Sequence, residues 1–338
     1  MGIAGSGHSH GGPVRWVVIS LVGLAGWSET IRVIKKAFML GAGLGTRLRP
    51  LTERLPKPLV PLFHRPLVEW GMVACRELGV REFAINTHHL PEAWQAVDRG
   101  LGIGDWRESE LVGANGERGM VGSWEDCPVH LFHEAELLET GGGIKNIASW
   151  IGDDDVLVHN GDIYSSMPLG RLIEAHEASD HIATLALRSE GVAKHIAHVD
   201  GRVTDIRRML GHADGSHVFS GLYCFSPKLL EFLPEEEKVS VIPAFLELIK
   251  LGKLGCVVID DGIWFDLGDP ASYLAAHREL GLADPVHVDA VIAAGAQVER
   301  SVIGPRATIA DGAVVRDSVV WPGADVGADE SLMGEVRM

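Results

Sequence analysis

The sequence predicts an α/β protein with a doubly wound, mostly parallel sheet, followed by a short β-helix near the end of its 338 residues. An apolar run at Ala37–Leu40, a helical pattern at Pro66–Leu78 and an apolar run at Val80–Asn86 follow one another. Strand, helix and strand in that order form a βαβ unit, which favours a parallel sheet. From about residue 290, apolar positions repeat every six residues with Gly, Ala and Asp at the turns, which is typical of a hexapeptide β-helix.

These patterns divide the chain into three expected segments. Residues 1–32 begin small and polar and continue with an apolar run that is too short to span a bilayer. We interpret them as a disordered extension or a misplaced start, and we expect no membrane contact. Residues 33–284 form the expected α/β domain, and residues 285–332 form the expected β-helix.

The charge balance is acidic, with 46 Asp and Glu against 30 Lys and Arg. Nucleic-acid-binding proteins usually carry a basic face, so the composition disfavours DNA or RNA as a partner. Positive charge is nevertheless concentrated in one stretch, which contains a single acid, Glu53, and the residues Arg47, Arg49, Arg54, Lys57 and Arg65. A local basic cluster in an acidic chain is typical of a site for an anionic small molecule. The four cysteines are widely spaced and form no CxxC pair, so we expect buried thiols and no zinc site.

Proline and glycine residues mark where elements of the α/β domain begin and end. The helix at 66–78 has Pro66 in its first turn and Gly79 as its stop, and we expect a core face of Leu67, Trp70, Ala74 and Leu78. Residues 98–128 have no clean period, and we interpret them as an inserted surface loop or lid.

Further elements are expected later in the domain. We expect strands at residues 183–187 and 254–259 and a hairpin at 197–203 that turns at Asp200-Gly201. Asp269 and Pro270 are expected as the N-cap and first residue of a helix that ends near Leu280.

A glycine-rich turn follows the first strand. Gly41, Gly43 and Gly45 permit close approach of a ligand to the backbone, whose N–H groups suit phosphate, and Arg47 and Lys57 add full charges. The Walker pattern fails because no lysine follows the glycines at the required spacing. The dinucleotide fingerprint fails because Thr46 stands where a third glycine is needed.

A second polar position follows the strand at Asp155–Asn160. The strand delivers Asp162 to the same edge of the sheet, and a carboxylate facing a polyphosphate is what a Mg²⁺ site needs. Asp153, Asp154 and Asp155 lie at the other end of this strand, where we expect a solvated turn. We expect the loop of His88 and His89 to contact a bound nucleotide, and we expect no zinc site there.

Together these motifs resemble the signature of the sugar-1-phosphate nucleotidyltransferases. The signature stands here as GAGLGTRLRPLT at 41–52 and PKPLVP at 56–61, although the two alanines usual before its first glycine are replaced by Leu40-Gly41. The stretches LETGGG at 138–143, HVFSGLY at 217–223 and WFDLGDP at 264–270 resemble further motifs of the family. The resemblance covers about residues 33–332. It implies a Rossmann-like nucleotidyltransferase domain and a left-handed β-helix tail.

The resemblance also implies roles for individual residues. Arg47 and Lys57 would be catalytic, Asn160 and Gly221 would bind the sugar, and Asp162 and Asp266 would hold Mg²⁺. The nucleotide would be bound by residues of the two glycine-rich loops, namely Leu40, Gly41, Ala42, Gly43, Gly45, Thr46, Gly141 and Gly142. The family's Glu-Lys-Pro motif is missing from 205–209, and the candidates for its lysine remain open: Lys194, Arg207 and Arg208.

The implied activity is transfer of a nucleotidyl group from a nucleoside triphosphate to a sugar 1-phosphate, giving an NDP-sugar and pyrophosphate. The loops resemble those of mannose-1-phosphate guanylyltransferases and N-acetylmuramate-1-phosphate uridylyltransferases, and the β-helix favours mannose 1-phosphate with GTP. Uridylyl or thymidylyl transfer to another sugar 1-phosphate is the alternative. A non-catalytic regulatory subunit and a bifunctional enzyme with an acyltransferase tail also stay open. We expect a cytoplasmic homo-oligomer that assembles through the β-helix.

Overall fold

A computed structural model describes residues 34–96, 102–235 and 237–338. The expectations for residues 1–32, and for 98–101 within the predicted loop, lie outside these residues. Across the described ranges, no helix combines the length and the apolar character that crossing a membrane requires.

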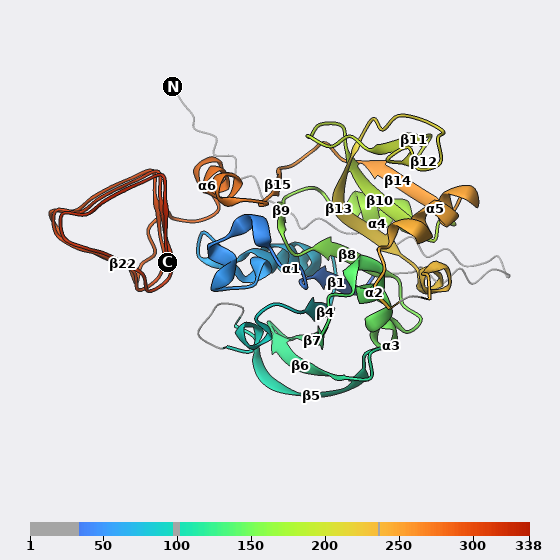
Figure 1. Ribbon diagram of the computed structural model, residues 1–338, viewed down its shortest axis with the longest axis horizontal. Coiled ribbons are helices and arrows are strands. Elements are labelled where there is room, and N and C mark those ends of the chain that lie inside the picture. Colours follow the sequence, from blue (N-terminus) through green and yellow to red (C-terminus); the bar gives the residue numbers. More distant parts are fainter. Residues whose placement is uncertain (1–33, 97–101, 236) are drawn as a thin grey trace, which may run out of the picture. The chain divides into compact units, whose positions relative to one another are not determined.

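The largest element is an eleven-stranded sheet in the order β11-β12-β14-β10-β13-β8-β1-β4-β7-β6-β5, which Figure 1 shows from its upper to its lower edge. The strands are β1 (Lys36–Leu40), β4 (Glu82–Thr87), β5 (Gly104–Val112), β6 (Arg118–Trp124), β7 (Cys127–His133), β8 (Val156–Asn160), β10 (Ala183–Arg188), β11 (Ile196–Val199), β12 (Arg202–Ile206), β13 (Val218–Phe225) and β14 (Leu254–Val258). Two small ladders accompany the sheet, formed by β2 (Pro61–Leu62) with β3 (Arg65–Pro66) and by β9 (Ile163–Ser165) with β15 (Trp264–Asp266).

The centre of the sheet is parallel. β1 pairs in parallel with β4 and with β8, and β4 pairs in parallel with β7. These central strands are buried, so they read as continuous apolar runs. Their carboxyl ends at Leu40, Thr87 and Asn160 therefore meet at one edge of the sheet. The predicted α/β class is confirmed, and antiparallel strands extend the parallel centre on both sides.

The predicted surface loop at 98–128 is wrong for the residues that the structure describes. Residues 104–112 and 118–124 form β5 and β6, an antiparallel pair at the edge of the sheet. Their register shifts between Gly104 and Arg107 and again between Glu108 and Val112, and β5 is largely exposed. Bulges and exposure on both faces remove the two-residue alternation by which a strand is recognised in a sequence.

The helices are α1 (Leu67–Glu77), α2 (Glu139–Asn146), α3 (Ala148–Ile151), α4 (Gly170–Glu177), α5 (Ile242–Lys250) and α6 (Pro270–Glu279). The first five flank the sheet, whereas α6 packs in an apolar cluster with the β-helix (Figure 1). Short 3₁₀ turns are η1 (Thr46–Leu48), η2 (Leu51–Glu53), η3 (Lys57–Leu59), η4 (Pro91–Trp94) and η6 (Pro227–Phe232). The predicted start of α6 is confirmed, because the Asp269 side chain accepts a hydrogen bond from Ser272 N in a capping box.

The buried face of α1 differs from the predicted one. Its buried residues are Leu67, Val68, Gly71, Met72 and Cys75, whereas Leu78 is 38 % exposed. The helix approaches the sheet at Gly71, where a Cβ atom would lie 2.8 Å from the His159 ring. Leu67 is buried as predicted and Trp70 packs, partly buried, against an apolar cluster, whereas Ala74 is only partly buried and the prediction for Leu78 is wrong. A pattern of apolar side chains cannot show the contact at Gly71, because glycine has no side chain.

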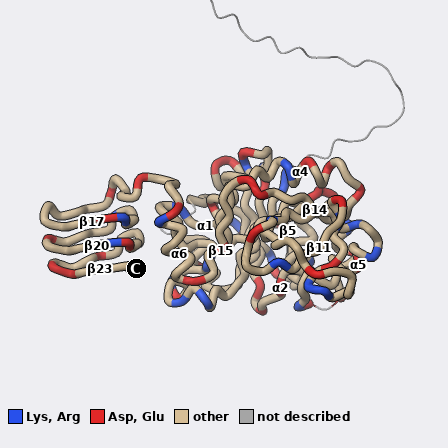
Figure 2. The backbone as a smooth tube through the Cα atoms, turned by 90° about the horizontal axis from the view of Figure 1, so that it is seen from above, with Lys and Arg blue, Asp and Glu red and all other residues tan. Residues whose placement is uncertain are grey.

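The C-terminal segment is a three-sided parallel β-helix. Its strands are β16 (Val291–Ile292), β17 (Gln297–Glu299), β18 (Val302–Ile303), β19 (Thr308–Ile309), β20 (Val314–Arg316), β21 (Val319–Val320), β22 (Asp325–Val326), β23 (Ser331–Met333) and β24 (Val336–Arg337). Figure 2 shows β17, β20 and β23 stacked on one another. Equivalent positions in successive coils are 17 residues apart, as Ser301 and Ser318 are, so one turn in each coil is shorter than a strict six-residue repeat requires.

One apolar cluster joins α6, the 48–67 region and the β-helix. The buried Tyr273 hydroxyl accepts a hydrogen bond from Trp321 Nε1 at 3.0 Å and donates one to Pro61 O at 2.5 Å. All four cysteines are free and buried, as predicted.

Candidate active site

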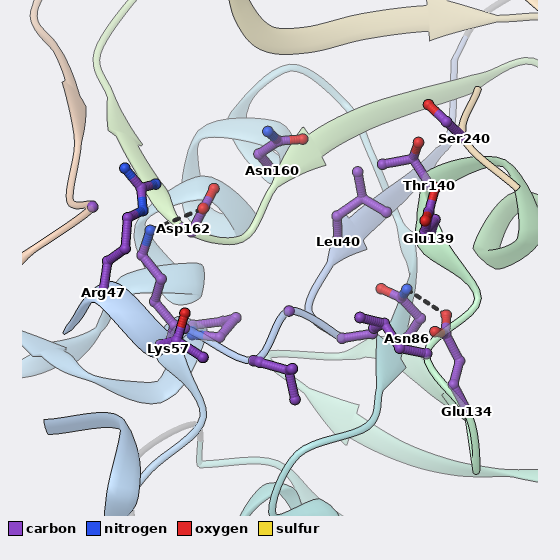
Figure 3. Close-up of a pocket in the computed structure, with 18 residues that line it drawn as sticks. Leu40, Arg47, Lys57, Asn86, Glu134, Glu139, Thr140, Asn160, Asp162 and Ser240 are labelled. Carbon is purple, nitrogen blue, oxygen red and sulfur yellow. Dashed lines mark hydrogen bonds and ion pairs between the residues drawn. The ribbon is translucent and has the colours of Figure 1, made fainter. Parts of the chain in front are cut away.

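A cavity of about 560 Å³ opens at the carboxyl edge of the parallel strands. Its lining comes from the glycine-rich loop, the 134–140 segment and the end of β8, and consists of Leu40, Ala42, Gly43, Leu44, Gly45, Thr46, Arg47, Lys57, Pro58, Asn86, Glu134, Leu137, Glu139, Thr140, Asn160, Asp162, Ser240 and Gly268. Figure 3 shows Arg47, Lys57 and Asp162 at one end and Asn86, Glu134, Glu139 and Thr140 at the other. The cavity therefore has one end where charged groups of both signs meet and another that is rich in hydrogen-bond acceptors.

The glycines of the loop serve different purposes. Gly45 has φ of 60°, and a Cβ atom there would lie 2.7 Å from Thr52 Cγ2, so the turn itself requires glycine. A Cβ atom at Gly41 would lie 2.7 Å from Asn86 O. No protein atom lies within 4 Å of the Cβ position at Gly43, whose backbone is therefore open to a ligand.

Arg47, Lys57 and two aspartates form the charged end. Lys57 is 6 % exposed, and its Nζ lies 2.9 Å from Asp162 Oδ2 and 3.6 Å from Asp266 Oδ1. The antiparallel ladder of β9 with β15 pairs Ile163 with Asp266, which brings together two aspartates more than a hundred residues apart. The side chains of both aspartates are more than a third exposed, so their outer oxygens are accessible.

The donor set fits a magnesium ion. Mg²⁺ prefers hard oxygen ligands and is commonly held by one or two carboxylates, with waters and substrate phosphates completing an octahedron. Within the described ranges, no group of three or more His, Cys, Asp and Glu is arranged as a metal site. Two carboxylates beside a phosphate-binding loop suit a cation that arrives with a nucleotide better than a permanent protein cage.

Arg47 is accommodated by a glycine from a distant motif. A Cβ atom at Gly268 would lie 3.2 Å from Arg47 Nη1, so the guanidinium packs against backbone that carries no side chain. Gly268 also lines the cavity, although it was not predicted as a site residue. The motif that contains Asp266 therefore contributes to the arginine's position as well as a carboxylate.

A buried hydrogen-bond network links the two nucleotide loops. Gly41 N donates to Asn86 Oδ1 at 2.8 Å, and Asn86 Nδ2 donates to Glu134 Oε1 at 2.6 Å. Glu134 Oε2 accepts from Leu138 N at 2.9 Å. Glu134 is 1 % exposed, and burial raises the pKa of its carboxyl group. Sequence reasoning missed this role of Asn86 and Glu134, although a single acid directly after an apolar strand was a usable signal.

Gly141 and Gly142 lie in the first turn of α2. Their N–H groups donate to Val239 O at 2.8 and 2.9 Å, and a Cβ atom at Gly141 would lie 2.8 Å from Ser240 O. Close packing against the 237–240 segment therefore explains the glycines without a ligand. Glu139 and Thr140 line the cavity instead, and nucleotide binding by Gly141 and Gly142 stays a prediction.

The two residues predicted to bind the sugar are in contact. Gly221 has φ of 81°, and a Cβ atom there would lie 2.7 Å from Asn160 Nδ2. Trp264 Nε1 donates to Ser220 O at 2.8 Å, which fixes the same strand. Asn160 lines the cavity, and sugar binding by the pair stays a prediction.

The remaining predicted residues lie elsewhere. None of Lys194, Arg207 and Arg208 is among the residues that line the cavity, and the replacement for the family's lysine stays open. His88 and His89 do not line the cavity either. Their rings donate hydrogen bonds to backbone carbonyl groups, His88 to Glu134 O and His89 to Thr52 O, both at 2.7 Å.

The predicted solvated turn at 153–155 is wrong for its last residue. Asp155 is 8 % exposed and its Oδ2 lies 3.6 Å from Nε2 of the buried His176. The carboxylate points inward beneath α4 because β8 begins at the next residue.

The chain matches two families of known proteins. Residues 36–281 match the Nucleotidyl transferase family, and residues 272–335 match the family of GlmU-like, C-terminal hexapeptides. The chain therefore belongs to the nucleotidyl transferase family. Its β-helix resembles the hexapeptide segment found in some of these proteins.

The names of curated relatives state a nucleotide and a sugar phosphate. The chain is 27 % identical over 252 residues to a mannose-1-phosphate guanylyltransferase of Mycobacterium tuberculosis, covering 72 % of this chain and 64 % of that protein. It is 24 % identical over 254 residues to a UTP–glucose-1-phosphate uridylyltransferase of Synechocystis sp., covering 72 % of this chain and 62 % of that protein. The chain thus spans less than two thirds of the length of these relatives.

A shorter relative is covered almost completely. The D-glycero-alpha-D-manno-heptose 1-phosphate guanylyltransferase of Aneurinibacillus thermoaerophilus is 26 % identical over 248 residues, which are 72 % of this chain and 98 % of that protein. Among solved structures, the UDP-glucose pyrophosphorylase of Acinetobacter baumannii superposes with a TM-score of 0.57 at 19 % identity, over 72 % of this chain and 92 % of that one. That likeness supports the fold.

Proposed function

We propose that this protein is an enzyme that transfers a nucleotidyl group from a nucleoside triphosphate to a sugar 1-phosphate, with Mg²⁺ as its cofactor. The observation that carries the proposal is the cluster of Lys57, Asp162 and Asp266 beside the glycine-rich loop, in which Lys57 Nζ lies 2.9 Å from Asp162 Oδ2 and 3.6 Å from Asp266 Oδ1. An ammonium with one carboxylate that lines the cavity and a second, accessible one beside it suits phosphoryl chemistry, in which catalysis rests mainly on positioning and charge.

Each residue then has a defined task. The loop N–H groups and Arg47 hold the β- and γ-phosphates and stabilise the departing pyrophosphate. Lys57 neutralises the α-phosphate as the sugar phosphate approaches it. Asp162 and Asp266 would hold Mg²⁺, which supplies charge neutralisation and orientation when bound. No general base is needed, because a phosphate monoester is largely ionised near neutral pH, with a second pKa of about 6.

Within this reaction we propose GTP and mannose 1-phosphate as the substrates. The end of the cavity away from Lys57 presents the exposed carboxylate of Glu139, whereas both oxygens of the buried Glu134 already accept hydrogen bonds from Asn86 and Leu138. An ionised carboxylate only accepts hydrogen bonds. Guanine offers adjacent N–H donors on its N1 and N2 positions, whereas uracil and thymine flank one N–H with two carbonyl oxygens. An acceptor carboxylate at the base end therefore favours guanine, and two of the named relatives are guanylyltransferases.

The test is pyrophosphate release from a matrix of four nucleoside triphosphates and several sugar 1-phosphates, with Mg²⁺ or with EDTA. Metal-dependent turnover that is highest with GTP and mannose 1-phosphate supports the full proposal. Turnover with UTP or dTTP and another sugar 1-phosphate would retain the reaction and reject the substrates. Nucleotide binding without turnover of any pair would contradict the reaction and favour a regulatory subunit.

We also propose that the β-helix carries a homo-oligomer contact. Its first coil exposes apolar side chains, with Val288 at 90 % and Val291 at 61 % exposure. Light scattering of the full chain and of a Val288→Glu, Val291→Glu variant tests this. A larger mass for the wild type supports the contact, and a monomeric wild type contradicts it.

A further inference from the structure

A second and larger cavity lies outside the catalytic one. It has a volume of about 1010 Å³ and shares no lining residue with the catalytic cavity. One wall is formed by the segment 53–66 with η4, and the other by turns of the β-helix around Arg306 and Trp321. We call it the β-helix groove.

The groove contains three arginines in a chain whose net charge is −16. They are Arg54, Arg65 and Arg306, against the acids Glu53 and Glu92. Arg65 stacks over Trp70 at 5.4 Å and lies 4.0 Å from Glu69. Across the described ranges, no ion pair or side-chain hydrogen bond is found for Arg54 or Arg306. Two exposed guanidinium groups therefore remain available on opposite walls.

Arg306 occupies a backbone position that does not suit it. Its φ is 59°, in the left-handed region where a non-glycine residue is strained. The equivalent turn of the next coil, 17 residues on, has Gly323 with φ of 70°. The turn itself would be better served by glycine. Arg300, Asp317 and Asp329 also have positive φ in turns of the β-helix, so Arg306 is distinguished from them by its side chain, which lines the groove.

The groove also has an apolar surface. Leu55, Leu59 and Leu90 contribute from one side, and Pro305 and Trp321 from the other. Trp321 is held rigidly, because its Nε1 donates to the buried Tyr273 hydroxyl. A ligand that fills this groove therefore needs both an anionic group and an uncharged body.

We propose that the β-helix groove is a second binding site, for an organic phosphate. The phosphate lies between Arg54 and Arg306, because a guanidinium group presents paired N–H donors that match phosphate oxygens. The uncharged body of the ligand packs on the wall formed by Leu55, Leu59 and Trp321. Binding at this site does not depend on the proposed transfer reaction, whereas the coupling described next rests on it.

The position of the groove couples it to the catalytic loop. Leu59 lines the groove and belongs to the same 3₁₀ turn as Lys57. Thr52, next to Glu53 of the groove, donates from Oγ1 to Gly45 O at 2.9 Å. A ligand that fixes residues 53–59 therefore acts on both the glycine-rich loop and the catalytic lysine.

Isothermal titration of the full chain tests the site with two probes, inorganic phosphate and glucose 6-phosphate. Glucose 6-phosphate has no phosphate on C1, so it is not a substrate of the proposed reaction. The proteins are the wild type, Arg54→Gln, Arg306→Gln and the control Arg107→Gln, which removes an exposed arginine of β5 that does not line the groove. Arg47→Gln removes a cation that lines the catalytic cavity, so it reports binding of a phosphate there.

We expect saturable binding of glucose 6-phosphate that is tighter than that of inorganic phosphate. We expect each groove variant to weaken it about tenfold or more, since each removes one charge-assisted contact. The Arg107→Gln and Arg47→Gln variants should bind as the wild type does. Binding of neither probe by the wild type, binding that survives in both groove variants, or binding lost in Arg47→Gln would each overturn the proposal.

The coupling has a separate readout. With glucose 6-phosphate at saturation, the KM for the nucleoside triphosphate should change at least twofold in the wild type and remain constant in Arg306→Gln. An unchanged KM in the wild type, with binding present, would overturn the coupling to the catalytic loop.

Discussion

Replacing Glu134 by glutamine tests whether a buried carboxylate fixes the two nucleotide loops. Its two oxygens accept from Asn86 Nδ2 at 2.6 Å and from Leu138 N at 2.9 Å. Glutamine offers one oxygen and one NH₂ group, so one of the two donors faces another donor. Asn86 cannot turn its amide to compensate, because its Oδ1 already accepts from Gly41 N.

The expected loss of stability comes from one hydrogen-bond donor that is left without an acceptor. One buried donor without an acceptor costs about 1–3 kcal/mol. We therefore expect Glu134→Gln to lower the free energy of unfolding by that amount in urea denaturation near neutral pH. We also expect an increased KM for the nucleoside triphosphate, because the loop that begins at Gly41 loses its tie to Leu138.

The matched control is Glu136→Gln, which makes the same chemical change at an exposed position two residues away. Its free energy of unfolding and its KM should equal those of the wild type. If Glu134→Gln behaves like Glu136→Gln in both measurements, the network does not hold the loops and the reasoning is refuted.

Three further predictions concern stability. Gly71→Ala places a Cβ atom 2.8 Å from the His159 ring, and such overpacking should destabilise the fold by about 1–3 kcal/mol in urea denaturation. Tyr273→Phe leaves the buried Trp321 Nε1 without its acceptor and should cost about 1–3 kcal/mol, measured in the same way. Burial raises the pKa of Glu69 to about 7 from 4.5, so the folded state holds this proton more tightly. Wild-type stability relative to Glu69→Gln should therefore fall as pH rises from about 4.5 to 7.

Each of these has a matched comparison. Gly281→Ala adds a Cβ atom in open space and should be neutral, so equal effects at Gly71 and Gly281 would argue against the close contact. Tyr164→Phe removes a hydroxyl for which no hydrogen bond is found within the described ranges, and it should cost less than Tyr273→Phe. A constant difference between wild type and Glu69→Gln across pH 4.5 to 7 would contradict the raised pKa.

Local motifs explain which parts were predictable from the sequence. The glycine-rich loop and Asp162 each follow a strand within a few residues, so spacing alone places them at the carboxyl edge of a parallel sheet. Lys57 lies farther along the chain and is predicted by its place in the family signature. Asp266 was identified by its resemblance to a family motif, and the ladder of β9 with β15 brings it to Asp162.

Features that depend on tertiary contacts were missed. Asn86 and Glu134 meet only because β4 and β7 are neighbours, and no spacing in the sequence reveals that pair. The face of α1 was misassigned because its closest contact is made by Gly71, which has no side chain to count. The strands at 104–112 and 118–124 show no regular alternation of apolar and polar residues, because bulges interrupt their pairing, and the prediction of a loop there is wrong.

The most direct test of the central claim is pyrophosphate release by Asp162→Asn and Asp266→Asn beside the wild type. Each variant removes one carboxylate charge near Lys57, and the control Asp261→Asn removes an exposed one that pairs with Arg171. We expect both site variants to lose at least about a hundredfold in kcat at fixed Mg²⁺, with a folded chain and retained nucleotide binding, while the control keeps wild-type turnover. Wild-type turnover in both site variants would contradict the assignment of this cavity as the catalytic centre.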